Sequence, residues 1–292
     1  MKKIITSAST SNLGPGFDCL GLALSIFNTF TIEKTNTTTL LNVAEEYNNE
    51  DNLFLKAYRY GCAYLQKEVP IQVDFHTEVP IARGLGSSST FIVGGITAAF
   101  LQNNLPLDKE CIFQLASQME GHPDNAAPCV YGGFSASITL DDGSFHTEQL
   151  ALNDQYQFTC FIPDFEVSTE EARKILPDVY LRHIAVRNSA KAILVTKALE
   201  SGDLSLLQQC ATDEIHEPYR KSLIPGFDQL KAISEKDTAG VFLISGSGST
   251  CILIHKDSLS LEAQNHIQNL DGHWQIRNLK TYHEGLIVED VV

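Results

Sequence analysis

The sequence lacks long apolar runs and cysteine motifs, and these absences narrow its class. No stretch reaches the ~18 apolar residues of a membrane-spanning helix, and the first residues lack the apolar segment of a signal peptide. The seven cysteines are scattered and form no C-x-x-C pair, unlike a disulfide framework or a zinc site. They are Cys19, Cys62, Cys111, Cys129, Cys160, Cys210 and Cys251. We therefore expect a cytoplasmic protein with reduced thiols.

Basic residues are also scarce. The chain has 21 Lys and Arg against 36 Asp and Glu, a formal charge of −15. This balance argues against binding to nucleic acid or to an anionic membrane. Its 292 residues, 43% of them hydrophobic, suffice for two globular domains. A ligand as negative as ATP would need local partners, such as helix N-termini, a metal ion or a few arginines.

One stretch is rich in glycine and serine. An alternating segment before it, residues 71–78, predicts a strand, and an apolar segment after it, residues 91–101, predicts a buried helix. Glycine lets a backbone bend sharply near a ligand, serines can cap a helix start, and the first helical turn attracts phosphate. We therefore predict a phosphate cradle. Its residues are Pro80, Ile81, Ala82, Arg83, Gly84, Leu85, Gly86, Ser87, Ser88, Ser89 and Thr90.

This predicted cradle is neither a Walker loop nor a dinucleotide fingerprint. No lysine lies between Lys67 and Lys109, and Ser89 occupies the third glycine position of G-x-G-x-x-G. By pattern alone, an ordinary glycine-rich turn with a serine cap remains the alternative. The run Pro-x-x-x-Gly-Leu-Gly-Ser-Ser resembles the ATP loop of the GHMP small-molecule kinases, although Ser89 replaces the usual alanine. The resemblance implies that ATP binds here.

The first turn-rich segment, residues 12–18, reads Asn-Leu-Gly-Pro-Gly-Phe-Asp. By themselves, Asn12 and Asp18 fit turn chemistry. Together with the following Cys-Leu-Gly-Leu-Ala-Leu, however, the segment resembles the opening signature of the homoserine kinase branch of the family. The resemblance implies that Asn12 and Asp18 contact an amino-acid substrate, and a carboxylate suits its ammonium group.

A second signature follows a helix predicted for residues 108–120. Gly121 and Pro123 should end this helix and leave His122, Asp124 and Asn125 on an irregular loop, where either turn formation or an active site would use them. His-x-Asp-Asn-x-x-Pro followed by Gly-Gly resembles the second signature of that branch. The resemblance implies that His122 touches the substrate. It also implies that Asn125 is the catalytic residue beside the reacting hydroxyl, where some relatives have an aspartate base.

A kinase of this type needs Mg²⁺ on its phosphates. In relatives, a serine of the cradle and a glutamate on the helix before the histidine hold it. The usual glutamate position, about two turns before the histidine, is Gln114 here. We therefore expect Ser88 and Glu120 as metal ligands, and the alternative is a site with fewer protein charges.

The second half of the chain contributes two arginines. Arg173, in Ser-Thr-Glu-Glu-Ala-Arg, could be an exposed helix charge, but this segment and the Glu-Pro-Tyr-Arg that ends at Arg220 also resemble homoserine kinases. The resemblance implies that both arginines bind the substrate carboxylate, which a guanidinium fits bidentately. Gly246, in Gly-Ser-Gly-Ser-Thr, resembles the third GHMP motif and is expected to bind substrate.

The resemblance implies the α+β GHMP kinase fold. We expect an N-terminal mixed β/α domain (residues 1–153) like domain 2 of ribosomal protein S5, which binds ATP, and a C-terminal ferredoxin-like α/β-plait domain (residues 154–292). The expected activity is ATP-dependent phosphorylation of L-homoserine in threonine biosynthesis. The alternatives are a GHMP kinase for another small alcohol, mevalonate-like or a sugar, and a nucleotide-binding relative without catalysis. L-homoserine and Mg-ATP are the expected partners, neither nucleic acid nor membrane is expected, and a homodimer is left open.

Overall fold

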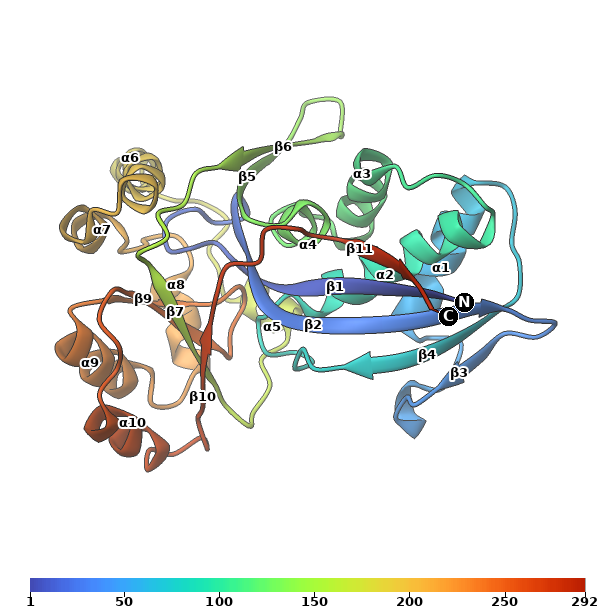
Figure 1. The fold of residues 1–292 in the computed structure, drawn as a ribbon. Coiled ribbons are helices and arrows are strands. Elements are labelled where there is room, and N and C mark those ends of the chain that lie inside the picture. Colours follow the sequence, from blue (N-terminus) through green and yellow to red (C-terminus); the bar gives the residue numbers. More distant parts are fainter. Residues whose placement is uncertain (292) are drawn as a thin grey trace.

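A computed structural model describes residues 1–291, and these form two β-sheets with helices around them (Figure 1). The first sheet has the order β11-β1-β2-β4-β3, and β5 and β6 extend it from β2. Its strands are β1 (Lys2–Ser11), β2 (Leu20–Lys34), β3 (Thr39–Leu41), β4 (Ile71–Thr77), β5 (Phe134–Thr139), β6 (Phe145–Leu150) and β11 (Ile287–Asp290). The structure confirms the predicted α+β fold.

Strand β2 joins the two ends of this sheet. Its 15 residues form one strand and pair antiparallel with β1. Residues 28–34 of β2 pair with β4, whereas residues 20–22 pair with β5. The register with β1 shifts between Ser7 and Ala8, a bulge of the kind that bends a strand. The hairpin β5–β6 is thereby attached at the end of β2 that adjoins the second sheet.

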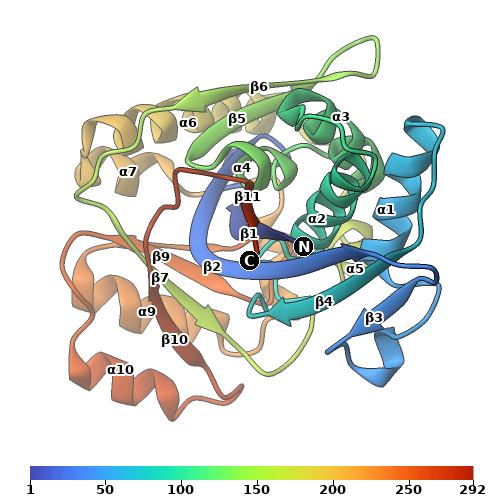
Figure 2. The same cartoon turned by 45° about the vertical axis from the view of Figure 1, so that its right-hand side comes forward.

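Four helices lie on one side of the first sheet (Figure 2). They are α1 (Leu53–Tyr64), α2 (Ser87–Gln102), α3 (Lys109–Glu120) and α4 (Ala126–Tyr131). Helix α2 is buried along most of its length because Gly94 and Gly95 let it approach its neighbours closely. A Cβ on Gly94 would lie 2.7 Å from the ring of Phe30, and a Cβ on Gly95 only 2.3 Å from the carbonyl oxygen of Phe54. This close packing holds α2, including its first turn, in a fixed position relative to its neighbours.

The second sheet has the order β10-β7-β9-β8. Its strands are β7 (Gln157–Ile162), β8 (Val241–Ile244), β9 (Cys251–His255) and β10 (Gln275–Leu279), and α9 (Phe227–Thr238), α10 (Leu261–Gln268), α6 (Arg182–Ser201) and α7 (Leu204–Cys210) accompany them. Neighbouring strand residues face opposite sides, so Phe161 packs with residues of α9 and α10, whereas Cys160 packs with residues of α6 and α7. Within residues 1–291, no helix combines the length and the apolarity of a membrane-spanning segment.

The two sheets share one core. Ala8, Leu22 and Leu24 of the first sheet belong to the same buried cluster as Leu243 and Ile252 of the second. The last strand, β11, returns to pair with β1. The division at residues 153/154 remains a prediction. Two short helices, α5 (Thr169–Lys174) and α8 (Glu217–Arg220), carry the predicted arginines to this junction.

Three helix predictions differ from the structure. The sequence pattern predicts helices over residues 188–200 and 204–215. Helix α6 instead begins at Arg182, because its first turns are largely exposed and carry little apolar periodicity. Helix α7 ends at Cys210 instead of Ile215. The next carboxylate along the chain, Asp213, accepts N–H hydrogen bonds of the three residues that follow Glu214, which turns the chain into α8. Residues 126–131, for which the sequence pattern predicted no helix, form α4 directly after the predicted loop.

Candidate active site

A cavity of about 650 Å³ opens at the junction of the two sheets. Fourteen of the predicted site residues line it. They are Ile81, Ala82, Arg83, Gly84, Gly86, Ser87 and Ser88 of the cradle, and Asn12, Asp18, His122, Asn125, Arg173, Arg220 and Gly246 from elsewhere in the chain. Five of the predicted site residues do not line it: Pro80, Leu85, Ser89, Thr90 and Glu120. The segments therefore meet as the predicted site requires, although they are spread over more than 230 positions of the chain.

The cradle depends on two glycines in left-handed conformations. Gly84 has φ 71° and Gly86, the residue before α2, has φ 64°. A Cβ on Gly84 would lie 2.2 Å from the carbonyl oxygen of Ser245, and a Cβ on Gly86 2.1 Å from the hydroxyl of Ser9. Side chains larger than hydrogen are therefore excluded for both conformational and steric reasons.

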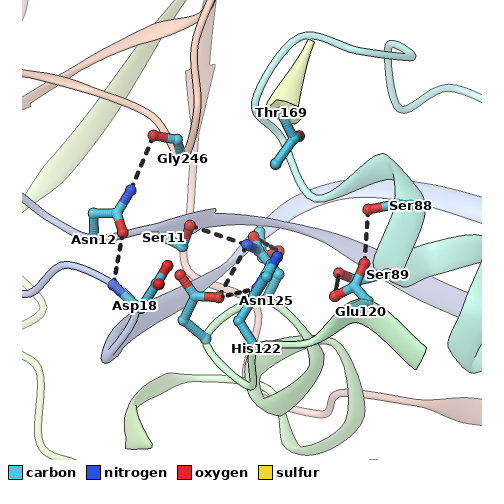
Figure 3. A network of polar contacts seen from close by, with 12 residues as sticks. Ser11, Asn12, Asp18, Ser88, Ser89, Glu120, His122, Asn125, Thr169 and Gly246 are labelled. Atoms are coloured by element: carbon cyan, nitrogen blue, oxygen red, sulfur yellow. Dashed lines mark hydrogen bonds and ion pairs between the residues drawn. The ribbon is translucent and has the colours of Figure 1, made fainter. Parts of the chain in front are cut away.

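The predicted serine cap of α2 is wrong. No side chain accepts a hydrogen bond from its first turn, so the N–H groups and the positive end of the helix dipole are left for a ligand. The hydroxyls of Ser88 and Ser89 instead donate to the two carboxylate oxygens of Glu120, at 2.7 and 2.6 Å (Figure 3). The first turn of α2 therefore combines free donors with a carboxylate at its side.

Glu120 is the last residue of α3, and its carboxylate contacts the first turn of α2. Burial raises its pKa, against the lowering effect of His122 and of the two serine hydroxyls. Gln114, six residues earlier, faces a different neighbour. Its side chain donates to the carbonyl oxygen of Phe145 at 2.5 Å and accepts from the Phe145 N–H at 3.0 Å. Gln114 therefore holds β6 against α3.

Arg83 ties the cradle to the second sheet. Its guanidinium donates to the carbonyl oxygens of Pro163 and Asp164, at 3.0 and 2.8 Å, just beyond β7. It also lies 3.0 Å from the carboxylate of Glu166. These bonds occupy much of its donor capacity, so Arg83 fixes the position of the loop.

His122 and Asp124 form a hydrogen-bonded pair in the second signature. The ring Nδ1 lies 2.6 Å from Oδ1 of Asp124, which is 1% exposed. Burial lowers the pKa of His122, but the hydrogen bond and the charge of Asp124 outweigh it and raise the pKa to about 8. The imidazole is therefore mostly a cation at neutral pH. Asp124 was not among the predicted site residues, although its place in His-Pro-Asp-Asn was visible.

Asn125 is held by β1. Its Oδ1 accepts from the hydroxyl of Ser9 at 2.8 Å, and its Nδ2 donates to the hydroxyl of Ser11 at 3.0 Å (Figure 3). These bonds fix the side-chain amide at the start of α4, against the cavity.

Asn12 and Asp18 close the first turn-rich segment. Both have positive φ, 72° and 53°, and Oδ1 of Asn12 accepts the N–H of Asp18 at 3.0 Å. Nδ2 of Asn12 donates to the carbonyl oxygen of Gly246 at 2.9 Å. Asp18 receives a bidentate pair from Arg173, at 2.9 and 2.8 Å. Asn12 therefore both stabilises the turn through its side chain and lines the cavity.

Arg220 is a buried cation without an anionic partner. It is 2% exposed and donates to the carbonyl oxygens of Ala172 and Gly246, both at 3.0 Å. Among residues 1–291, no carboxylate lies within ion-pair distance of it. Burial, and next the charge of Arg173, lower its pKa to about 10. A buried arginine is rarely left unpaired, so this half of the cavity lacks one negative charge.

The far end of the cavity comes from a segment that the sequence did not mark. Residues between the end of β3 and the first residue of α1 line it, including Asn42 and Tyr47 from the connecting segment and Leu53 from α1. The sequence showed only a helix cap there: Oδ1 of Asn52 accepts hydrogen bonds from the N–H groups of Phe54 and Leu55 at the start of α1. Thr169 also lines the cavity, with its hydroxyl 3.4 Å from that of Ser247. No motif distinguished the residues between β3 and α1 from ordinary loop and cap residues, whereas Thr169 and Ser247 lie in two of the segments that carry the resemblance.

Comparison with known proteins defines the class. The N-terminal domain of GHMP kinases matches residues 52–133, and the C-terminal domain of GHMP kinases matches residues 195–269. The chain therefore belongs to the GHMP kinase family, whose members use ATP. The crystal structure of a mevalonate kinase, 16% identical, shares this fold with a TM-score of 0.73 over 97% of this chain and 99% of the other.

Other relatives narrow the class. Homoserine kinase from Aquifex aeolicus (strain VF5) is 36% identical, and that from Clostridium botulinum (strain Langeland) is 33% identical; each match covers 99% of both chains. The crystal structure of homoserine kinase from Cytophaga hutchinsonii, 25% identical, superposes with a TM-score of 0.83 over 98% of this chain and 96% of the other. The chain falls within the homoserine kinase branch of the family.

Proposed function

We propose that this protein transfers the γ-phosphoryl group of ATP to the side-chain hydroxyl of L-homoserine, giving O-phospho-L-homoserine for threonine biosynthesis. The full-length similarity to homoserine kinases supports this assignment. The single observation that carries it is the charge arrangement at one end of the cavity, where Asp18 pairs with Arg173 beside the unpaired Arg220.

This arrangement suits a zwitterion. The ammonium group of an amino acid would take the Asp18 carboxylate, and its carboxylate would take the two guanidinium groups, including the buried one that has no anion. A sugar carries neither charge, and mevalonate carries no ammonium group. Both alternatives would leave Asp18 or the arginines without a function in substrate binding.

The cradle is proposed to bind the triphosphate. The uncapped first turn of α2 supplies N–H donors and the positive end of the dipole, which together attract phosphate. Gly84 and Gly86 let the backbone come close to the ligand. The open segment of residues 42–53 at the same end of the cavity leaves room for the nucleoside.

The oxygen donors beside the cradle fit Mg²⁺. Magnesium prefers oxygen ligands and is commonly held by one or two carboxylates together with substrate phosphates. Ser88 Oγ and the Glu120 carboxylate lie 2.7 Å apart, and burial disfavours the charge of Glu120 until a cation accompanies it. When bound, the ion would neutralise charge on the β- and γ-phosphates. We propose Ser88 and Glu120 as its protein ligands.

The residues of the site would act by position and charge. The homoserine hydroxyl oxygen forms a bond to the γ-phosphorus while the bond from that phosphorus to the bridging oxygen of ADP breaks. We assign to Asn125, fixed by Ser9 and Ser11, the placing of this hydroxyl. An amide cannot take the proton, so the proton leaves to a phosphate oxygen or to solvent. The positive charge on His122 favours the anionic groups that gather in the cavity.

Release of ADP with L-homoserine, Mg²⁺ and ATP tests the proposal directly. We expect turnover with L-homoserine to exceed that with mevalonate, galactose or L-serine by at least about a hundredfold, because only homoserine satisfies both charge partners at the right chain length. Faster turnover of mevalonate or a sugar would replace the assignment with another GHMP kinase. ATP binding without turnover of any alcohol would support the non-catalytic alternative.

A further inference from the structure

The ring of Phe17 lies against the two arginines at the charged end of the cavity, although Phe17 is not itself part of the cavity lining. The Cζ atoms of Arg220 and Arg173 lie 5.1 and 5.7 Å from its centroid. The imidazole of His216 stacks on the same ring, with centroids 5.3 Å apart and planes at 28°. One aromatic ring therefore contacts both arginines that face the proposed substrate.

We propose that Phe17 is a positioning residue, which holds the guanidinium groups of Arg173 and Arg220 in place for the substrate carboxylate, and that stacking with His216 holds the Phe17 ring. The inference rests on the proposed function and deepens it. An aromatic face attracts a guanidinium group and favours flat stacking, so one ring can hold two such groups in defined planes.

The two arginines need such a support because they repel one another. The positive charge of Arg173 is one of the causes that lower the pKa of Arg220. Asp18 compensates Arg173 through its bidentate pair, but Arg220 has only carbonyl oxygens. The negative face of an aromatic ring supplies attraction to both cations without competing for the carboxylate that they await.

His216 is built in as a neutral support. It is fully buried, and its Nε2 donates to the carbonyl oxygen of Gly14, 3.1 Å away, in the same segment as Phe17. Burial lowers the pKa of His216, against Asp213, which raises it, and Arg220 lowers it further. A neutral ring adds no third positive charge next to the arginines.

The surrounding contacts keep this segment rigid. Asn188 of α6 donates to the carbonyl oxygen of Pro15 at 2.9 Å. A Cβ on Gly14, which has φ 77°, would lie 2.3 Å from the carbonyl oxygen of Ala211. Contacts with α6 and with the end of α7 thus hold the backbone of residues 14–17 in place, and this fixes the position of the Phe17 ring.

The test replaces Phe17 while keeping its apolar bulk. We expect F17L to raise the KM for L-homoserine about tenfold, the loss of cation–π attraction at two partly buried contacts. The KM for Mg-ATP should change less than twofold, because no contact of Phe17 reaches the cradle. F17Y keeps the ring and should restore the homoserine KM to within about threefold of the unaltered enzyme.

A matched control is available in Phe27. It is also partly buried and makes one aromatic contact, to Tyr282, but among the described residues no arginine or lysine lies over its ring. F27L should therefore leave both KM values unchanged, although it removes a ring of the same kind. Circular dichroism and thermal unfolding check that each variant is folded. If F17L does not fold, H216Q, which keeps the donor to Gly14 and removes the stacked ring, should raise the homoserine KM about threefold.

The outcomes separate this inference from the proposed function. No turnover of L-homoserine by the unaltered enzyme would remove the proposed function. With turnover intact, an unchanged homoserine KM in folded F17L would overturn the positioning role. So would a parallel rise of both KM values, or an F17Y that is as impaired as F17L. With H216Q as the substitute, an unchanged homoserine KM would have the same meaning.

Discussion

The two ends of the cavity present different kinds of chemical groups to a ligand. The cradle end depends on backbone: positive-φ glycines, the open first turn of α2 and one carboxylate beside it. The opposite end depends on charged side chains, Asp18, Arg173 and Arg220, from segments far apart in the chain. A backbone site accepts the phosphates that all nucleotide-using relatives share. A charged side-chain site selects one substrate, because charge pairs discriminate by sign and geometry.

The largest expected effect is at Glu120, the carboxylate beside the first turn of α2. E120Q keeps the shape and a hydrogen-bonding side chain beside Ser88 and Ser89 but removes the charge that we assign to Mg²⁺. We expect kcat to fall about 10³-fold, because metal neutralisation of the phosphates contributes several kcal/mol to phosphoryl transfer. Steady-state rates over a range of Mg²⁺ concentrations measure it.

Q114A is the control for that change because it lies on the same helix. Gln114 contacts Phe145 instead of the cavity, so the variant should lose some stability and keep its kcat. Equal losses of kcat in Q114A and E120Q would show that the assignment of the metal ligand is wrong.

The next effect is at the buried cation of the opposite end. R220M should lower kcat/KM for L-homoserine about a hundredfold, because it removes a desolvated charge and leaves two carbonyl oxygens unpaired. The KM for Mg-ATP should stay within about twofold. If instead the ATP parameters change most, the two ends do not act separately and the comparison fails.

A smaller effect is expected at the more exposed arginine. The side chain of Arg173 is 38% exposed, so solvent screens its charge more than that of Arg220. R173A should raise the homoserine KM about tenfold, with much less change for ATP. Substrate titrations at saturating partner concentrations measure both values, and equal effects on the two substrates would contradict the assigned role.

The smallest effect is a pH dependence of stability from His122, which lies between the two ends. Its pKa rises from 6.5 to about 8 on folding, so its contribution is fully present below pH 6.5 and is lost as pH rises through about 8. The loss amounts to about 2 kcal/mol. D124N removes the partner, so the decline in unfolding free energy between pH 6 and 9 should be shallower than in the unaltered protein. Denaturant titrations measure it, and identical declines would exclude the pair as its cause.

Sequence patterns predicted most of the fold, because the cues involved are local. Alternation predicted β4 at residues 71–78, and α3 forms where a helix was predicted at residues 108–120, with Asp108 as its cap. The predictions failed where tertiary contacts decide. The start of α6 is exposed, and the hydroxyls of Ser88 and Ser89 turn to Glu120 because α3 ends next to the start of α2.

By itself, the sequence indicated where the cradle lies, because glycine is required where φ is positive and the backbone approaches closely. Only the tertiary structure showed that the first turn of α2 is uncapped and that the Glu120 carboxylate contacts Ser88 and Ser89, whereas the Gln114 amide contacts Phe145. It also showed that, among residues 1–291, Arg173 has an ion pair and Arg220 has none. The physical reason is that burial and charge compensation are set by neighbours from elsewhere in the chain. Asp18 and Arg173, for example, are 155 positions apart and meet only when the two sheets close on each other.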